Sequence, residues 1–497
     1  MAGNIIGLDA SAANDRGNAV SGIALINSRN VVIGTDGDGH SDADEYNIIS
    51  GNNARGILLT TGANDTTIAG NIIGLNKAEN AVPNGTSGNP QGGIRLAGGA
   101  DTVQIGTDGD GLSDALERNI ISGNLGPGIT VGTATLVTIS GNYIGTDVDG
   151  AEARPNSIDG IQAGPSAEQL VIGVPNGGNE AQGNLISGNA QTGVNLIGAP
   201  QAVIAGNWIG LNSKGDAAIP NQFFGVWLTD TSGARVGTDG NDDADKYEKN
   251  IISGNWGNNV MVMGDDAVKN WIAGNWIGLD ATGSLAIPHP TSTANTGIAI
   301  QSGATTGPVS TVIGSNEDGL NDEIEANYIS GNAASGIWLA GQQDTTVSGN
   351  VIGLSAVSAK GSAKVPNGGA GIWINTTSAT PPASPATIRG NTISGNDGDG
   401  IKIEDGGGHL ISGNFIGVDV IGSGSLGNGL NGIHLTVTAG TMTVIGTNGN
   451  GILDAAERNI ISGNLDYGVL IATNSCRVAG NYIGTDLSGS VAIPNDE

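Results

Sequence analysis

Five insertions in this chain repeat one arrangement of acidic and amide side chains that is suited to binding a cation. Each follows the frame Asp/Asn-x-Asp/Asn-x-x-x-Asp-x-x-Glu-x-Asn, and the spacing is the same in every copy. Carboxylates crowded into one loop repel one another unless a cation neutralises them. Calcium accepts about six to eight oxygen ligands in flexible geometry, and loops rich in Asp, Asn and Gly supply them. The frame therefore predicts calcium-binding loops.

The four oxygen-bearing positions of each frame are the candidate calcium ligands. They are Asp36, Asp38, Asp42 and Glu45; Asp108, Asp110, Asp114 and Glu117; Asp239, Asn241, Asp245 and Glu248; Asn316, Asp318, Asp322 and Glu325; and Asn448, Asn450, Asp454 and Glu457. The spacing differs from that of an EF-hand. The last loop has only two carboxylates and should bind most weakly. The loop at Val174–Gly183 lacks the frame. The alternative is a set of solvated acidic turns without a metal.

A second group of residues could bind or process a carbohydrate. Trp338, Trp373, Lys402 and His434 hold the same outward position in consecutive repeats, and Glu404 lies nearby in the sequence. Aromatic faces beside charged groups suit sugar binding or catalysis in a groove. The alternative is a surface column of mixed composition. No nucleophile motif, phosphate loop or metal-hydrolase motif accompanies these residues.

The element that must position both groups is a short strand that opens with Asn-x-Ile. It recurs about fifteen times, with Ile always two residues after the Asn, while the residue between them varies. One constant and one variable face indicate a strand. Two further short apolar runs follow each copy, and they are rich in β-branched residues and bounded by Gly and Asn. This pattern predicts an all-β, right-handed parallel β-helix of about 15 coils, each with three short strands.

The coils alternate between long and short forms. The predicted repeats start at residues 4, 71, 142, 207, 275, 350 and 414, with a partial repeat at 481. Residues 1–3 precede one solenoid that spans 4–497. In the long coils an insertion follows the first strand and often ends in Pro-Asn. The outward face of that strand is apolar, so either these insertions fold back over it or it packs against another molecule.

Two small residues are expected to form ladders or bends between coils. The Asn that opens each first strand should stack on its neighbours about 4.8 Å apart, with side-chain amides hydrogen-bonded along the stack. A Gly precedes most second strands, and at Asn259 an Asn replaces it. Because both residues tolerate positive φ, the pattern predicts a left-handed bend there.

Composition limits the classes of function. The chain has 47 acidic and 18 basic residues and a net charge of −29, which disfavours nucleic acid and anionic membranes as partners and favours cations. Cys476 is the only cysteine, so no intrachain disulfide can form. No apolar run of about 18 residues predicts a membrane span. Met1-Ala2-Gly3 is not an export signal.

Two resemblances follow from these motifs. The acidic frames, read at Asp108–Asp114, resemble the calcium loops of bacterial thrombospondin type-3 repeats. The phrases Asn-x-Ile-Ser-Gly-Asn, Gly-Ile-x-Leu and Gly-Asn-Tyr-Ile-Gly-Thr-Asp at Gly141–Asp147 resemble right-handed parallel β-helix repeat proteins of the pectate-lyase-like superfamily. That superfamily includes polysaccharide lyases, hydrolases, epimerases, phage depolymerases and long bacterial surface proteins, so the resemblance implies a fold more than an activity.

The sequence favours a non-catalytic, extracellular or cell-surface solenoid from a prokaryote, stabilised by structural calcium. It would be adhesin-like or filament-forming, with itself, through end-to-end or lateral assembly, or a cell-surface polysaccharide as partner. The regular repeat argues against an enzyme, because active sites usually interrupt a repeat. A carbohydrate-active enzyme (a polysaccharide lyase, epimerase or depolymerase) and a glycan-binding module remain the alternatives.

Overall fold

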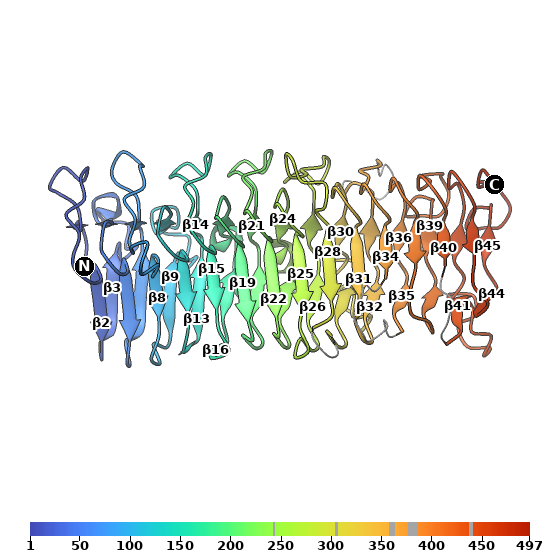
Figure 1. The fold of residues 1–497 in the computed structure, drawn as a ribbon, viewed down its shortest axis with the longest axis horizontal. Coiled ribbons are helices and arrows are strands. Elements are labelled where there is room, and N and C mark those ends of the chain that lie inside the picture. Colours follow the sequence, from blue (N-terminus) through green and yellow to red (C-terminus); the bar gives the residue numbers. More distant parts are fainter. Residues whose placement is uncertain (242–243, 304–306, 357–362, 376–384, 437–440) are drawn as a thin grey trace. The chain divides into compact units, whose positions relative to one another are not determined.

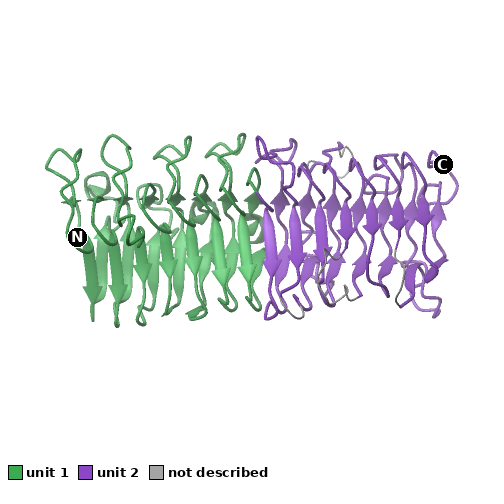
Figure 2. Cartoon of the chain, in the orientation of Figure 1, with its two compact units in different colours: residues 1–237, 243–256 green, residues 238–242, 257–497 purple. Residues whose placement is uncertain are grey.

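The computed structural model describes residues 1–497 except 242–243, 304–306, 357–362, 376–384 and 437–440 (Figure 1). The chain forms two compact units (Figure 2). Unit 1 contains residues 1–237 and 243–256, and unit 2 contains residues 238–242 and 257–497. Each unit is built from three parallel sheets, to which every coil contributes one strand. The prediction of one solenoid over 4–497 stays a prediction.

Unit 1 pairs its strands in the order of the repeats. Its first sheet contains β1 (Ile5–Ile6), β4 (Ile48–Ile49), β7 (Ile72–Ile73), β10 (Ile120–Ile121), β14 (Tyr143–Ile144), β18 (Leu185–Ile186), β21 (Trp208–Ile209) and β24 (Ile251–Ile252). Its second sheet contains β2 (Ile23–Ile26), β5 (Ile57–Thr60), β8 (Ile94–Leu96), β11 (Ile129–Val131), β15 (Ile161–Ala163), β19 (Val194–Ile197) and β22 (Val226–Thr229). Its third sheet contains β3 (Arg29–Gly34), β6 (Asn64–Ala69), β9 (Val103–Gly106), β13 (Val137–Ser140), β17 (Val171–Gly173), β20 (Val203–Ala205) and β23 (Arg235–Gly237). The remaining elements of unit 1 are the pair β12 (Ala134–Thr135) and β16 (Ala167–Glu168), the 3-10 turns η1 (Asp42–Asp44) and η2 (Glu180–Gln182), and the single-turn helix α1 (Asp245–Glu248).

Unit 2 has the same arrangement. Its first sheet contains β27 (Trp276–Ile277), β30 (Tyr328–Ile329), β33 (Val351–Ile352), β36 (Thr392–Ile393), β39 (Phe415–Ile416), β42 (Ile460–Ile461) and β45 (Tyr482–Ile483). Its second sheet contains β25 (Val260–Met263), β28 (Ile298–Gln301), β31 (Ile337–Ala340), β34 (Ile372–Ile374), β37 (Ile401–Ile403), β40 (Ile433–Leu435) and β43 (Val469–Ile471). Its third sheet contains β26 (Trp271–Ala273), β29 (Val312–Gly314), β32 (Thr346–Ser348), β35 (Thr387–Arg389), β38 (Leu410–Ser412), β41 (Thr443–Gly446) and β44 (Cys476–Ala479). The predicted three short strands per coil are therefore confirmed.

The interior of each unit is a set of stacked aliphatic side chains. Ile49, Ile73 and Ile121, each two residues after an Asn, are fully buried and paired in register. Because the strand side chains alternate between faces, one buried position per strand is enough to build a continuous core. The constant Ile of the sequence pattern is this inward position.

Two ladders of buried asparagines join the coils. In the predicted ladder, Asn71 Nδ2 donates to Asn119 Oδ1 at 2.9 Å, and Asn119 Nδ2 donates to Asn142 Oδ1 at 2.9 Å. A second ladder runs through the Ser-Gly-Asn and Pro-Asn residues. There Asn52 Nδ2 donates to Asn84 Oδ1 at 2.8 Å, and the amide of Asn84 continues to the next coil. Each amide also satisfies backbone groups at the bends, which would otherwise be buried without partners.

The glycines before the second strands do not have the predicted left-handed backbone. Gly22 and Gly128 have no positive φ. They are required because a Cβ at Gly22 would lie 2.8 Å from both the carbonyl oxygen of Gly56 and the side-chain nitrogen of Asn52. The close approach of backbone to the second asparagine ladder leaves no room for a side chain. The prediction of a left-handed bend at these positions was wrong.

The Pro-Asn insertions fold back over the apolar outer face of the first sheet. In unit 1, Ile48 is only 3% exposed and packs with Leu8 and Ala12, which belong to an insertion. In unit 2, Ile460 packs in the same way against Val418 and Ile493. The apolar face is thus a covered layer and needs no partner molecule to bury it.

The insertions also bond to one another from coil to coil. Lys77 N donates to the carbonyl oxygen of Ala12 at 3.1 Å, and Ser213 N donates to that of Gly150 at 2.9 Å. These contacts form a second layer outside the first sheet. Among the described residues, no helix is long and apolar enough to cross a membrane.

Candidate functional site

The first two acidic loops, which follow β3 and β9 in unit 1, each gather three carboxylates. Asp36, Asp38 and Asp42 bring one oxygen each to within 4.8 Å of one another. The residues Asp108, Asp110 and Asp114 form the equivalent cluster. The frame spacing therefore does bring these predicted ligands together.

Backbone hydrogen bonds fix the loop conformation. The carboxylate of Glu45 accepts the backbone N–H of Asp36 at 3.2 Å, and Asp38 Oδ1 accepts the N–H of His40 at 2.8 Å. Thr35 donates its hydroxyl to Asp42 Oδ1 at 3.1 Å. The second loop repeats these contacts, with Glu117 accepting the N–H of Asp108 at 3.2 Å. The side chains thus converge because each one also closes a turn of its own loop.

The first and second loops touch. Ser113 of the second loop donates its hydroxyl to Asp42 of the first, and this bond holds the pKa of Asp42 below its ordinary value. Any side chain on Gly37 would collide with Glu117 Oε1, so the Glu117 carboxylate lies against the first loop. Burial raises the pKa of Glu117. The second loop thus adds a carboxylate to the surroundings of the first.

The fourth loop, in unit 2, has the same geometry. Glu325 accepts the backbone N–H of Asn316 at 2.9 Å, and Ser315 donates its hydroxyl to Asp322 at 2.9 Å. The side chain of Glu325 is fully buried, and its Oε1 has no hydrogen-bond partner among the described residues. Burial raises the pKa of Glu325. A buried carboxylate oxygen without a donor is the position that a cation would stabilise.

The fifth loop differs in charge. Its Asn448 donates its side-chain amide to Glu457 Oε1 at 2.7 Å, which replaces a carboxylate repulsion by a hydrogen bond. The Asp454 side chain keeps one buried oxygen without a described partner. Asn450 accepts the N–H of Ile452 at 2.7 Å, as the Asp does in the other loops. The loop therefore keeps its shape with less negative charge.

The third framed loop is divided between the units, and residues 242–243 lie outside the described residues. Asp239 and Asn241 belong to unit 2, while Asp245 and Glu248 are buried in α1 of unit 1. In unit 1 the guanidinium of Arg235 forms an ion pair with Glu248 at 2.7 Å. Sequence reasoning missed Arg235, although it is the single basic residue at its position among the third strands that precede framed loops.

The unframed loop at 174–183 braces the second loop. Its 3-10 turn η2 has a capping box, in which Asn179 and Gln182 bond each other's backbone. Gln182 Nε2 also donates to the carbonyl oxygen of Asp108 at 3.0 Å, and Asn179 Nδ2 donates to that of Gly109 at 2.6 Å. Side-chain amide hydrogen bonds from Gln182 and Asn179 therefore connect this loop to the second acidic loop.

The predicted aromatic column is assembled on the outer face of the second sheet of unit 2. Trp338 pairs in register with Trp373, and their rings stack with centroids 5.8 Å apart and planes 20° apart. Trp338 Nε1 donates to Asn375 Oδ1 at 2.7 Å, and Trp373 Nε1 donates to Glu404 Oε2 at 2.8 Å. These hydrogen bonds fix the orientation of both indoles.

The charged residues of this column are paired with one another. Lys402 Nζ lies 2.7 Å from Glu404 Oε1. Burial alone would raise the pKa of Glu404, but the hydrogen bonds from Lys402 and Trp373 outweigh it and lower the pKa. His434 Nδ1 lies 3.3 Å from Oδ2 of the buried Asp399, which the sequence reasoning missed. Asp399 also accepts the side-chain amide of Asn431 at 2.7 Å. Lys402 and Glu404 are therefore paired with each other.

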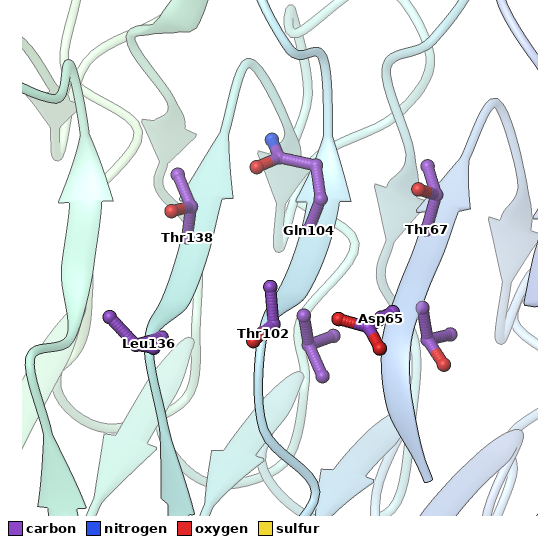
Figure 3. A pocket seen from close by; sticks show the side chains of 8 residues that line it. Asp65, Thr67, Thr102, Gln104, Leu136 and Thr138 are labelled. Carbon is purple, nitrogen blue, oxygen red and sulfur yellow. The ribbon is translucent and has the colours of Figure 1, made fainter. Parts of the chain in front are cut away.

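A surface groove of about 310 Å³ lies elsewhere, on the third sheet of unit 1 (Figure 3). Thr67, Gln104 and Thr138 stand on successive strands, and Thr102 and Leu136 occupy the preceding bends with φ of 56° and 55°. None of the predicted site residues lines this groove. Its lining has hydroxyl and amide groups but a single carboxylate, so no acid–base pair is present there.

Comparison with known proteins gives one family model and several solved structures. The family model described as "Periplasmic copper-binding protein (NosD)" matches residues 317–430. No match was found among curated proteins. A periplasmic alginate epimerase mutant aligns at 12% identity over 86% of this chain and 76% of that one, with a TM-score of 0.39.

Two further solved structures align with this chain. The A-module of an Azotobacter vinelandii mannuronan C-5 epimerase aligns at 13% identity over 90% of this chain and 97% of that one, with a TM-score of 0.37. A surface adhesin of Streptococcus pneumoniae aligns at 8% identity over 90% and 86%, with a TM-score of 0.22.

The segment that matches the family model offers few of the donors that copper prefers. Copper prefers imidazole, thiolate and thioether ligands. The segment that matches the family model contains one such side chain, His409, and its Nδ1 already accepts the N–H of Ala386 at 3.0 Å. Among the described residues, the metal-ligand clusters consist of carboxylates. The strand pairing, the repeat and the stacked interior together make the chain a right-handed parallel β-helix repeat protein.

Proposed function

We propose that this protein is a non-catalytic, extracellular or cell-surface solenoid that calcium stabilises. The convergence of three carboxylates in the first and second acidic loops supports this proposal most strongly. Their oxygen-only donors match calcium rather than a transition metal. The contact between Ser113 and Asp42 supports a structural role, because a cation here would order two insertions that already touch. An adhesin-like or filament-forming element needs such rigidity.

Thermal unfolding in calcium and in chelator tests the proposal. Calcium at about 100 times its dissociation constant stabilises a folded protein by about 2.7 kcal/mol per site. We expect chelation to lower Tm by on the order of 5–10 °C and calcium to restore it. The Asp114→Asn variant should lose part of this calcium-dependent shift.

A matched control separates a site effect from a charge effect. Asp149 is exposed and lies in a Pro-Asn insertion outside every acidic frame, so Asp149→Asn removes the same charge. It should keep the full calcium-dependent shift. An unchanged Tm on chelation, or equal losses in the two variants, would contradict the calcium proposal.

The aromatic column favours glycan binding as a second function. The stacked Trp338 and Trp373 offer apolar ring surface, and the Lys402–Glu404 pair borders it with hydrogen-bonding groups. Sugar rings stack on such surfaces while their hydroxyls bond to nearby charged groups. Because the charged groups pair with each other, the arrangement suits binding better than proton transfer.

Binding and digestion assays distinguish these functions. A glycan array with the wild-type protein and Trp373→Ala should show binding that the variant loses by about tenfold, if a sugar ring gains from one aromatic about as much as a nucleobase does, which is about 1–3 kcal/mol. Trp271→Ala, on another sheet of unit 2, serves as the control. Uronan cleavage or epimerisation that disappears in Lys402→Ala and His434→Ala would overturn the non-catalytic assignment.

A further inference from the structure

Two arginines in unit 1 lie together on a chain that has few cations. The protein carries 18 basic and 47 acidic residues, so a basic side chain has many carboxylates available. Arg154 pairs with Glu152 at 3.1 Å and Arg235 with Glu248 at 2.7 Å. Arg55 and Arg95 form no ion pair with a described carboxylate. The charge of Arg95 acts on Arg55.

The fold brings these two arginines to the same surface. Arg95 is the outward residue of β8 and pairs in register with Leu58 of β5 and Thr130 of β11. Arg55 lies at the bend just before β5, one coil earlier. Both side chains are partly buried. Neighbouring coils of a sheet lie about 4.8 Å apart, so Arg95 lies one coil from Leu58, which follows Arg55 by three residues.

The Arg55 guanidinium is held in place and keeps an unused donor. Its Nη2 donates to Oε1 of Gln91, and Gln91 in turn donates its Nε2 to Oδ1 of Asn89 at 2.6 Å. The buried Nε of Arg55 meets no acceptor among the described residues. A buried donor without a partner costs about 1–3 kcal/mol. The Arg55 guanidinium thus keeps one donor, Nε, for which the described residues of unit 1 supply no acceptor.

The electrostatics favour an anion at this position. Burial lowers the pKa of Arg55, and the positive charge of Arg95 lowers it further. A bound oxyanion would relieve both effects. Guanidinium groups bind carboxylate, sulfate and phosphate through paired N–H groups in one plane.

We propose that Arg55 and Arg95, oriented by Gln91, form a binding site for an oxyanion. The shared ligand chemistry is a carboxylate or sulfate group, and it can come from an acidic saccharide or from a free inorganic anion. The site lies on unit 1, whereas the aromatic column lies on unit 2, so this inference does not depend on glycan binding there. It would give an acidic protein a local preference for an anion that its net charge otherwise repels.

Isothermal titration with three probes tests the site and separates its ligand sources. The probes are a trigalacturonate, its carboxyl-reduced neutral analogue, and sodium sulfate at fixed ionic strength. We expect the trigalacturonate to bind and the neutral analogue to bind at least tenfold more weakly. The variant Arg55→Gln/Arg95→Gln should weaken binding at least tenfold. Sulfate binding without saccharide binding would assign the same site to free anions.

Two further variants serve as controls. Arg154→Gln removes one positive charge from unit 1 at a guanidinium that already has a carboxylate partner, so it should bind as the wild type does. Arg95→Lys keeps the charge but loses the planar pair of donors, so it should weaken binding less than the double variant does. Folding of each variant is checked by circular dichroism. No binding of either anion, or wild-type binding by the double variant, would overturn the proposal.

Discussion

At the residue scale, some carboxylates of the acidic loops are buried without a described counter-charge. Glu325 is the sharpest case, because one of its oxygens closes a backbone turn while the other has no described partner. Burial raises its pKa, so without a cation the charged form is disfavoured. With a cation the same oxygen becomes a ligand. One residue can thus destabilise the chelated protein and stabilise the calcium-bound one.

The effect of Glu325→Gln on the free energy of unfolding should therefore have opposite signs in chelator and in calcium. In chelator the variant is expected to be as stable as the wild type or more stable, because it removes a buried charge. In calcium it should be less stable, by on the order of 1–2 kcal/mol, because a ligand is lost. Urea denaturation in both buffers measures this. A variant that is less stable by the same amount in both would show that Glu325 serves only as a turn residue.

Arg235 should neutralise the buried carboxylate of Glu248 in the third acidic loop. Both side chains are largely buried, so Arg235→Met leaves a carboxylate without its counter-charge and should cost about 3–5 kcal/mol. The double variant Arg235→Met/Glu248→Gln should recover most of this loss, because it buries no unpaired charge. Denaturation midpoints of the four proteins give the coupling energy. Additive losses would mean that the pair does not act as a unit.

His409 gives unit 2 a dependence on pH. Its side chain is fully buried, burial lowers its pKa, and its Nδ1 must be unprotonated to accept the N–H of Ala386. Since the folded pKa lies below the unfolded value of about 6.5, this contribution is present above that pH and is lost as the pH falls below it.

The comparison of wild type with His409→Asn isolates this effect. The Asn side chain keeps an acceptor but does not titrate, so the stability difference between the two proteins should shrink by about 1 kcal/mol or more from pH 7 to pH 5. A constant difference between wild type and His409→Asn would contradict the assignment.

At the scale of the element, residues from different positions of the repeat can fill the same place in the asparagine ladders that join the coils. In unit 2, Asn332 donates to Asn367 at 2.8 Å, and a Pro-Asn residue normally precedes it in the ladder. The preceding insertion instead ends in Pro-His, and His289 turns away to accept the N–H of Ser292 at 2.8 Å. Asn259, which stands where other coils have Gly, donates to Asn332 at 2.8 Å in its place. The His at position 289 and the Asn at position 259 are therefore linked, because Asn259 supplies the donor that a Pro-Asn residue supplies in other coils.

A double-mutant cycle tests this exchange. Asn259→Gly alone should cost about 2 kcal/mol, because Asn332 loses a buried donor. His289→Asn alone should also destabilise, because two amides would compete for one place. The combination restores the pattern of the other coils and should be more stable than the sum of the single losses by at least about 1 kcal/mol. Strict additivity would refute the exchange.

At the scale of the whole molecule, the net charge of −29 makes stability depend on ions in two ways. Simple salt screens the repulsion among exposed carboxylates over about 8–10 Å. Calcium bound at ordered loops would act in addition, at much lower concentration. Magnesium requires a tighter octahedral geometry and should be a weaker substitute.

Melting temperature at constant ionic strength separates these effects. We expect about 2 mM calcium to raise Tm by several degrees, and sodium chloride of equal ionic strength to raise it by less than about 1 °C. Magnesium should fall between the two. Equal effects of calcium and magnesium would mean that screening, rather than the acidic frames, stabilises the protein.

The sequence by itself determined the repeating architecture. A constant Ile two residues after each Asn, with a variable residue between them, indicates alternating strand faces. An Asn repeated at each bend predicts a ladder of stacked side chains. Both patterns are short-range, so they can be read from the sequence. The same reasoning located the acidic frames and the aromatic column. For that reason the coil pattern and the first ladder are confirmed. Asp36, Asp38 and Asp42 lie together, and their role as calcium ligands stays a prediction.

Only the tertiary structure decided which residues meet from different coils. The second ladder, the Gly before each second strand, the Asp399–His434 contact and the placement of Arg55 near Arg95 all join different coils. The Arg235–Glu248 pair instead joins a strand to the loop that follows it, across 13 residues. The physical reason is that insertions of unequal length stand between the coils, so sequence distance does not report which side chains stack. Burial and partner then decide whether a charged residue is a ligand, a brace or an unsatisfied donor.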